Sequence, residues 1–409
     1  MANENSAISR RDFLIGLGKA AGISSGLFIS GCVLPSMVQT GGSATGHLAQ
    51  PAQPLYDRPR GPARAIDIHH HYFPAELVDE IKKHGRALGI EYLPPRNSRE
   101  SPLSFSFAGG SRLSLEPALA DVDKRFEIMG KGRVAMASVE VQTSAQGYQL
   151  GGERGAAWAR LYNEAIHNLV KRHPNRFVGM ATVPLQDPPR AAQVLEHAIR
   201  DLKFSGVTIA SNVNGKYFDS KEFDPFWKKA EELDVLVIMH PDNVLGSEKM
   251  GAYGLRTVCG NPADTTLSVG FMIYSGVFDR FPKLKLGLLH GGGFFPYHLG
   301  RFDQRFITGG DASRIPASQP PSRYLKNLYF DNLVYRVETV DYLRRMVGTE
   351  HVMVGTDYPY ELGDWMAVEK IEALNCTEAE REAMLYGNAR TLLKISASQQ
   401  AIETSPSPR

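Results

Sequence analysis

The sequence predicts an α/β protein with a (β/α)8 TIM barrel, and three observations support this fold class. Short apolar runs of strand length alternate with longer segments of helical period, which is the pattern of βαβ units around a buried parallel sheet. Eight such runs follow one another in one continuous region, and eight is the number of strands in this barrel. No GxGxxG motif follows the first run, so the alternative, a doubly wound open sheet, lacks its fingerprint.

The eight runs begin at Ala63, and we expect residues 64–395 to fold as the barrel. Helices are expected between them, for instance over 153–172, 189–202 and 263–278. The long segment between the first run and its helix, residues 76–115, predicts a lid or small subdomain over the carboxyl ends of the strands. In chain order the runs read ARAIDIH, RVAMASVEVQT, RFVGMATVPL, SGVTIAS, VLVIMH, LKLGLLH, LYFDNLV and HVMVGTD.

Residues 1–32 resemble a twin-arginine export signal. Arg10 and Arg11 precede a moderately apolar stretch of small residues, and the alternative, a surface arginine pair before a buried helix, lacks an opposite polar face. The stretch ISGC, which ends at Cys32, also looks like a bacterial lipobox, whose cysteine becomes lipidated. We therefore expect a protein of the periplasm or cell envelope that meets the membrane only through its signal or a lipid anchor. Cleavage after the signal would instead leave a soluble periplasmic chain.

Composition limits the partners and the sources of stability. The formal net charge is +2 and the charged residues are scattered, which predicts no nucleic-acid partner. The 3 cysteines are too few and too far apart for a disulfide framework or a zinc ribbon, so stability has to come from core burial. Residues 33–63 and 396–409 lack a hydrophobic period, and we expect a flexible linker and an unstructured tail there.

Side chains with metal-ligand chemistry end four of the apolar runs. They are His69, His70 and His71 in the first run, His240 in the fifth, His290 in the sixth and Asp357 in the eighth. Because alternate side chains share a face of a strand, His69 and His71 point into the barrel mouth while His70 points away. A histidine at a single strand end is more often a hydrogen-bonded structural residue, but four such ends at one face of a barrel favour a metal site.

His240 would add a third nitrogen, and Asp357 an oxygen, to the imidazoles of His69 and His71. This set of ligands leaves room for water and suits one divalent metal ion, with Zn²⁺ expected first and Mn²⁺ as the alternative. For His70 we expect packing or hydrogen bonding to a ligand instead.

Residues 64 to about 393 resemble the amidohydrolase superfamily, in the branch of aminocarboxymuconate semialdehyde decarboxylase and related non-oxidative decarboxylases. The resemblance rests on IDIHHHYFP, on HPDN at His240, on the block from NPADTTLSVGF to HGGGFFPYHLGRFD and on VGTDYPYELG. It implies that His69, His71, His240 and Asp357 bind the metal. It also implies that His290 is the general base acting on metal-activated water, with Asp357 as the second catalytic residue.

Two local features refine this expectation. Superfamily members with two metals bridge them with a lysine at the end of the fourth strand, but here SGVTIAS ends without lysine. A single metal is therefore expected, and Lys216, which lies further on, is expected to be a solvated loop lysine. The glycines after His290 either let a substrate approach the backbone or form a tight turn, and the sequence is compatible with both.

The branch implies a small aromatic or unsaturated carboxylic acid as substrate, and such an acid needs a cation to hold it. Arg301 resembles the family arginine that reaches the substrate of a neighbouring subunit, which implies a homodimer. The alternative for Arg301 is a surface ion pair on a helix. Arg112, in the insertion, lies roughly where the family places another substrate-binding arginine, and an ordinary surface role competes with that assignment.

The expected activity is that of a metal-dependent carboxy-lyase. The alternative is a metal-dependent hydrolase of a lactone, amide or related bond, because the branch also contains hydrolases and hydratases that use the same metal and water. An exported binding protein without activity is disfavoured by His290, since binding alone needs no base. Aminocarboxymuconate semialdehyde decarboxylases have a tryptophan shortly before the NPxxTT block. The stretch YGLRTVCGNPADTT has no tryptophan, so the identity of the substrate stays open.

Overall fold

The computed structural model describes residues 61–308 and 315–396. The export signal, the lipobox cysteine Cys32, nearly all of the predicted linker and the residues after 396 lie outside the described residues, so the expectations placed on them stay predictions. Within the two described ranges, no helix has both the length and the apolar character needed to cross a membrane.

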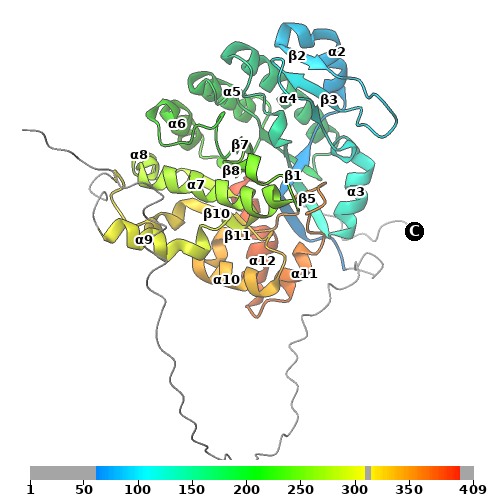
Figure 1. Ribbon diagram of the computed structural model, residues 1–409. Helices are drawn as coiled ribbons and strands as arrows, with labels where there is room; N and C mark the ends of the chain where they lie inside the picture. The colour runs from blue at the N-terminus through cyan, green and yellow to red at the C-terminus, as the bar shows by residue number, and fades with distance from the viewer. Residues whose placement is uncertain (1–60, 309–314, 397–409) are drawn as a thin grey trace, which may run out of the picture. The chain divides into compact units, whose positions relative to one another are not determined.

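The strands form a closed barrel of parallel strands, as the sequence predicts (Figure 1). Seven strand pairs follow one another in chain order, and the ring closes where the segment after the last strand meets the first strand. There the amide of Ile68 donates to the Val354 carbonyl at 2.9 Å. The strands are β1 (Ala65–Tyr72), β5 (Val134–Val141), β6 (Phe177–Ala181), β7 (Gly206–Ala210), β8 (Leu236–His240), β9 (Lys285–Leu288), β10 (Leu328–Asp331) and β11 (Val352–Met353).

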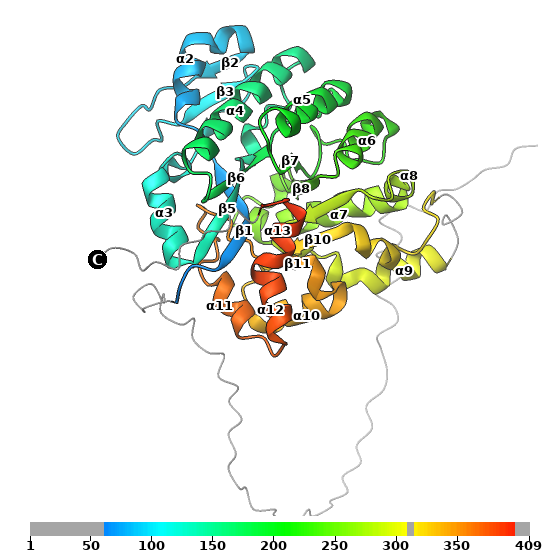
Figure 2. The same cartoon turned by 180° about the vertical axis from the view of Figure 1, so that it is seen from behind.

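Helices surround the barrel, and those expected from sequence appear close to their expected bounds (Figures 1 and 2). The segment expected as one helix over 263–278 is divided, because Gly276 adopts a φ of +73° between two helices. The helices between strands, and those that follow the last strand, are α3 (Val122–Lys131), α4 (Gly152–Arg172), α5 (Pro188–Arg200), α6 (Asp224–Glu232), α7 (Asn261–Tyr274), α8 (Val277–Arg280), α9 (Leu299–Ile307), α10 (Val337–Val347), α11 (Ala367–Glu372), α12 (Glu378–Glu382) and α13 (Asn388–Leu392).

The strands are apolar on both faces, which explains why they read as nearly continuous hydrophobic runs. One apolar layer packs between the strands and the outer helices, and a second fills the inside of the barrel. Leu392 and Leu393 at the end of α13 belong to the inner layer, and Lys394 Nζ donates to the carbonyl of Leu233, just before β8. Helix α13 therefore covers the amino-terminal end of the barrel (Figure 2), and the polar side chains gather at the opposite end.

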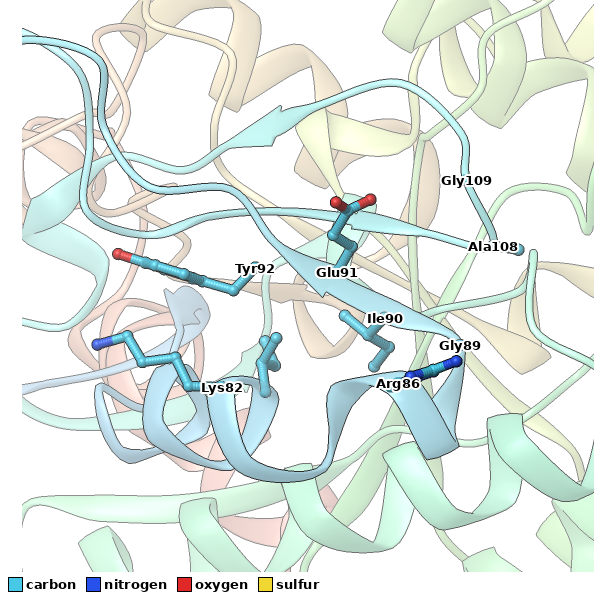
Figure 3. A pocket seen from close by; sticks show the side chains of 9 residues that line it. Lys82, Arg86, Gly89, Ile90, Glu91, Tyr92, Ala108 and Gly109 are labelled. Atoms are coloured by element: carbon cyan, nitrogen blue, oxygen red, sulfur yellow. The ribbon is translucent and has the colours of Figure 1, made fainter.

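The insertion at 76–115 forms a small subdomain of one helix and a three-stranded antiparallel sheet. It packs on α4, since the rings of Phe105 and Phe107 lie 6.1 and 5.7 Å from that of Trp158. A pocket between the helix and the sheet is bordered by Lys82 and Tyr92 (Figure 3). The expected position of the insertion as a lid stays a prediction. Its elements are α2 (Glu76–Leu88), β2 (Ile90–Tyr92), β3 (Ser104–Phe107) and β4 (Leu113–Ser114).

The three glycines after His290 form a tight turn packed against neighbouring elements. All three have positive φ, at +61°, +75° and +64°. A Cβ added to Gly292 would lie 2.6 Å from the ring of Phe330, and one on Gly291 or Gly293 would also meet neighbouring atoms too closely. Of the two roles compatible with the sequence, the structural turn is the one that this packing explains.

We therefore predict that Gly292→Ala lowers the free energy of unfolding by about 1–3 kcal/mol, because the new methyl group meets Phe330 and the backbone conformation disfavours it. Gly300→Ala is the matched control, since a Cβ on this helical glycine meets no atom within 4 Å. Urea unfolding of the metal-free proteins measures both, and equal stability of Gly292→Ala and wild type would contradict the steric explanation.

Candidate metal centre

Five side chains from four separate strand ends meet at the carboxyl end of the barrel. Asp357 Oδ1 lies 3.1 Å from His69 Nε2 and 3.2 Å from His71 Nε2, and Asp357 Oδ2 lies 3.7 Å from His290 Nε2. The ring of His240 lies 4.7 Å from that of His71 and 5.0 Å from that of His290, centroid to centroid. The structure thus brings together the five residues that the sequence placed at one face.

Several atoms of this cluster are buried and have no hydrogen-bond partner among the described residues. They include Nε2 of His69, Nε2 of His71 and Oδ1 of Asp357. Buried polar atoms in folded proteins are nearly always paired, and three such atoms that face one another form a donor set for a cation. One ligand atom from each of His69, His240, His290 and Asp357 lies within 4.8 Å of the others. The residues present therefore fit a divalent metal ion.

Hydrogen bonds behind the imidazoles hold them in this orientation. His69 Nδ1 lies 2.8 Å from Asp331 Oδ2, and His240 Nδ1 lies 2.9 Å from Thr143 Oγ1. Each bond occupies Nδ1 and leaves Nε2 directed at the centre, as is usual for metal-binding histidines. Asp331 is not among the residues predicted from the sequence, although LYFDNLV, the seventh run, also has a carboxylate at the end of its strand. Asp331 also accepts the amide of Gly291 at 2.7 Å, so it connects the ligand His69 to the turn that carries His290.

Two residues of the cluster have an uncommon backbone conformation. His290 has a φ of +56° and Asp357 a φ of +58°, in the left-handed region that residues other than glycine seldom adopt. The amide of Asp357 donates to the carbonyl of His69 at 2.9 Å, which fixes the carboxylate beside the imidazoles of β1. Backbone strain of this kind often occurs at functional sites.

The charges in the cluster balance one another. Burial would raise the pKa of Asp357, but the imidazoles of His69, His290 and His71 hold it well below its usual range. Burial would lower the pKa of His69, but Asp357 and Asp331 raise it well above its ordinary value. Burial and the neighbouring imidazoles lower the pKa of His240 well below its ordinary value. Asp357 is therefore ionised and His240 neutral near neutral pH, which are the forms that bind metals, whereas the raised pKa of His69 means that a metal ion would have to displace a proton from its ring.

His70 points away from the cluster, as the alternation along the strand predicts. Its Nδ1 lies 2.9 Å from Asp67 Oδ2, and its ring stacks on that of Tyr358 with centroids 4.7 Å apart. Burial lowers the pKa of His70 to about 4, so the side chain is neutral. The buried guanidinium of Arg125 also lies over the Tyr358 ring, 4.6 Å from its centroid, and its Nη1 donates to the His71 carbonyl at 2.8 Å. His70 thus packs beneath the site and helps to fix the backbone of the site.

The structure leaves the predicted substrate-binding arginines outside the cluster. Arg301 is exposed on α9 and forms no hydrogen bond or ion pair with another residue in the described part of the chain, which argues against an intramolecular ion pair. Arg112 donates to the carbonyls of Leu93 and Pro94 at 2.9 and 3.0 Å and pairs with Glu100 at 3.2 Å. The substrate roles of both stay predictions. Lys216 is 59% exposed and pairs with Glu222 at 2.8 Å, as expected for a loop lysine.

A (β/α)8 barrel with imidazoles and a carboxylate gathered at the carboxyl ends of its strands defines a class of metal-dependent barrel enzymes. The chain belongs to the amidohydrolase family, whose model matches residues 66–395.

Individual relatives support this assignment. The 2-amino-3-carboxymuconate-6-semialdehyde decarboxylase of Dictyostelium discoideum is 30% identical over 331 residues, which cover 81% of this chain and 91% of the relative. The crystal structure of 5-carboxyvanillate decarboxylase from Sphingomonas paucimobilis matches with a TM-score of 0.70 and 25% identity over 82% of this chain and 100% of that one. A dihydroxybenzoic acid decarboxylase from Polaromonas sp. JS666, with bound manganese and 2-nitroresorcinol, shares the fold with a TM-score of 0.67 and 24% identity over 83% of this chain and 99% of that one.

We predict that His240→Ala and Asp357→Asn each lower the metal content of the purified protein at least about tenfold, because each removes one ligand or its charge from the set. Elemental analysis after dialysis against a weak chelator measures the content. His84→Ala is the control, since His84 is 65% exposed on α2 and should leave the metal content unchanged. Full metal content in both site variants would refute the ligand assignment.

Proposed function

We propose that this protein is a metal-dependent non-oxidative decarboxylase that acts on a small aromatic or unsaturated carboxylic acid. The observation that carries the proposal is the cluster of His69, His71, His240, His290 and Asp357 in a member of a family that includes decarboxylases among its relatives. The names of those relatives give a carboxymuconate semialdehyde, carboxyvanillate and dihydroxybenzoic acid as the compounds that they decarboxylate.

For the metal we propose Zn²⁺, with Mn²⁺ as the alternative. Three imidazoles and one carboxylate are nitrogen and oxygen donors that zinc accepts, and a water or substrate would bind as a fifth ligand beside these four. The same nitrogen and oxygen donors also accept Mn²⁺, and the relative from Polaromonas contains manganese. The ligand set alone therefore favours a divalent first-row ion over Mg²⁺ or Ca²⁺, which prefer all-oxygen sites.

In the proposed mechanism His290 moves the proton. Its side chain is 13% exposed, so it lies at the boundary between the buried ligands and the barrel mouth. A bound divalent ion supplies positive charge that polarises water and the oxygens of the substrate. His290 then takes a proton from water at one ring nitrogen and donates it to the substrate carbon. The electron pair of the breaking C–C bond stays on that carbon and forms the new C–H bond as CO₂ leaves, and the hydroxide that remains takes up a proton from solvent. Asp357 keeps the neighbouring imidazoles in place, and Asp331 fixes the turn that carries His290 through the amide of Gly291.

The test uses a panel of aromatic and muconate-type acids scored for CO₂ release by the metal-loaded protein. We predict that wild type releases CO₂ from at least one acid and that His290→Ala lowers the rate at least about 100-fold while keeping its metal, because the variant loses the proton-transfer group. A hydrolase would instead incorporate solvent ¹⁸O into product without CO₂. Hydrolysis alone, or turnover that survives in His290→Ala, would refute the proposal.

We further propose that the active protein is a homodimer in which Arg301 of one subunit holds the substrate carboxylate in the site of the other. Two features support it: Arg301 is exposed without a partner among the described residues, and apolar side chains are exposed both on α9 and on α7, which packs on α9 through a hydrogen bond from Tyr274 to the Phe302 carbonyl. Leu267 and Phe271 on α7 are 39% and 40% exposed, and Ile307 on α9 is 67% exposed. Such side chains are typical of a surface that another chain covers.

Mixing two inactive variants tests this arrangement. We predict that Arg301→Ala and His290→Ala, each inactive alone, regain about one quarter of wild-type activity after being unfolded and refolded together. Half of the refolded dimers are mixed, and each mixed dimer has one site with both residues intact. Light scattering checks the dimer, and activity that stays absent in demonstrably mixed dimers would contradict the exchange of Arg301 between subunits.

A further inference from the structure

Glu140 is a buried carboxylate inside the barrel that the mechanism above does not use. It lies one residue before the end of β5 and has no exposed surface. Its Oε2 accepts the hydroxyl of Thr208 on β7 at 2.6 Å, but its Oε1 has no hydrogen-bond partner among the described residues. A carboxylate in such surroundings is destabilising unless positive charge or further hydrogen bonds compensate it.

The groups that face Glu140 belong to the metal centre. Oε1 lies 3.6 Å from Nδ1 of His71, and both side chains are completely buried. One ligand atom from each of His69, His71 and Glu140 lies within 4.8 Å of the others. No lysine or arginine in the described ranges forms an ion pair with Glu140, so the compensating charge has to come from the imidazoles of β1 and from whatever cation they bind. Burial raises the pKa of Glu140, and the nearby imidazoles of His71 and His69 oppose that rise. Glu140 and the histidines of the metal centre therefore interact electrostatically.

His71 also lacks a close partner of the kind that the other ligands have. His69 and His240 each have a polar atom within 2.9 Å of Nδ1. The nearest acceptor for His71 Nδ1 is the Val141 carbonyl, at 3.4 Å, which is a long hydrogen bond. The carboxylate of Glu140 lies only slightly further away and is the stronger acceptor for an imidazole N–H.

We propose that Glu140 is a positioning residue of the metal centre, whose carboxylate faces Nδ1 of His71 at 3.6 Å and strengthens metal binding through its negative charge. This inference rests on the proposed ligand set. It makes Glu140 the counterpart of Asp331, with one buried carboxylate behind each imidazole of β1. Thr208 on β7 holds the carboxylate in place from the opposite side. Partners behind a metal-binding histidine generally change metal affinity about 10–100-fold.

The proposal predicts that metal affinity and the stability of the metal-free protein change in opposite directions. Glu140→Gln keeps the shape and an oxygen acceptor but removes the charge, and Glu140→Met removes both. We expect both variants to raise the metal dissociation constant about 10–100-fold. We expect the metal-free variants to unfold at the same urea concentration as wild type or a higher one, because a buried carboxylate without full compensation has been removed.

Competition with a chromogenic chelator measures the dissociation constant, first for Zn²⁺ and then for Mn²⁺. Ser138→Ala is the matched control, since Ser138 is completely buried on the same strand and its hydroxyl has no described partner. It should leave metal affinity unchanged. Wild-type metal affinity in both Glu140 variants would overturn the proposal. So would a loss of metal affinity that merely follows a loss of stability of the metal-free protein, because that result marks a purely structural residue.

His240→Ala is measured in parallel to separate this inference from the ligand assignment. If His240→Ala weakens metal binding and the Glu140 variants do not, the ligand set stands and only the role of Glu140 is wrong. If neither change affects binding, the ligand set itself is wrong. In both cases the readout is metal affinity, so it does not depend on the identity of the substrate.

Discussion

The site depends on the closure of the barrel, because closure brings together side chains of the cluster that are far apart in the sequence. The last strand, β11, is short, and the segment after it continues along β1 through a few specific bonds. Thr356 donates its amide to Asp67 at 3.1 Å, Asp357 donates to the His69 carbonyl, and His71 donates to the Tyr358 carbonyl, the last two at 2.9 Å. These bonds are made by the very residues that supply ligands or flank them. A barrel that failed to close would therefore separate Asp357 from the imidazoles of β1, and the cluster would lose its carboxylate. The positive φ of Asp357 is compatible with this view, since the surrounding bonds determine that conformation.

Below the site the barrel is filled with aliphatic and methionine side chains, while at the level of the site buried carboxylates face imidazoles. Asp331 and Asp357 both contact His69, and Glu140 faces His71. In the described part of the chain no arginine or lysine forms an ion pair with any of these three carboxylates. The cluster is therefore balanced by imidazoles alone, whose charge depends on protonation. A divalent cation provides a positive charge that does not depend on protonation. It can also bind the unpaired nitrogen and oxygen atoms at the same time. These groups suit a metal because they are buried together without a lysine or arginine, among the described residues, to compensate the carboxylates.

Much of this arrangement could be predicted from the sequence. Strands buried on both faces are apolar at nearly every position, so all eight runs could be recognised, and the first polar residues after them mark the carboxyl end of the barrel. The five side chains of the cluster could be found for that reason. Glu140 could not be found in the same way, because it lies within the strand sequence VEV, where one acidic residue resembles a solvent-facing position. The packing of the glycine turn against Phe330, and the fold of the insertion, depend on contacts between distant segments that periodicity does not encode.

The distribution of cations around the site bears on how a carboxylic acid can bind. Arg125 is buried beneath the site, where it bonds to the carbonyls of His71 and Leu119 and stacks on Tyr358. Arg112 is engaged by two carbonyls and by Glu100 within the insertion. Neither guanidinium is thus free to meet an acid at the barrel mouth without breaking several bonds. Arg301 has no such bonds among the described residues and lies on the outer helix α9. If a metal holds one end of the substrate, a second positive charge has to approach from outside the cluster. In the proposed dimer, the exposed Arg301 of another subunit would meet this requirement better than Arg125 or Arg112, which are already engaged in several bonds.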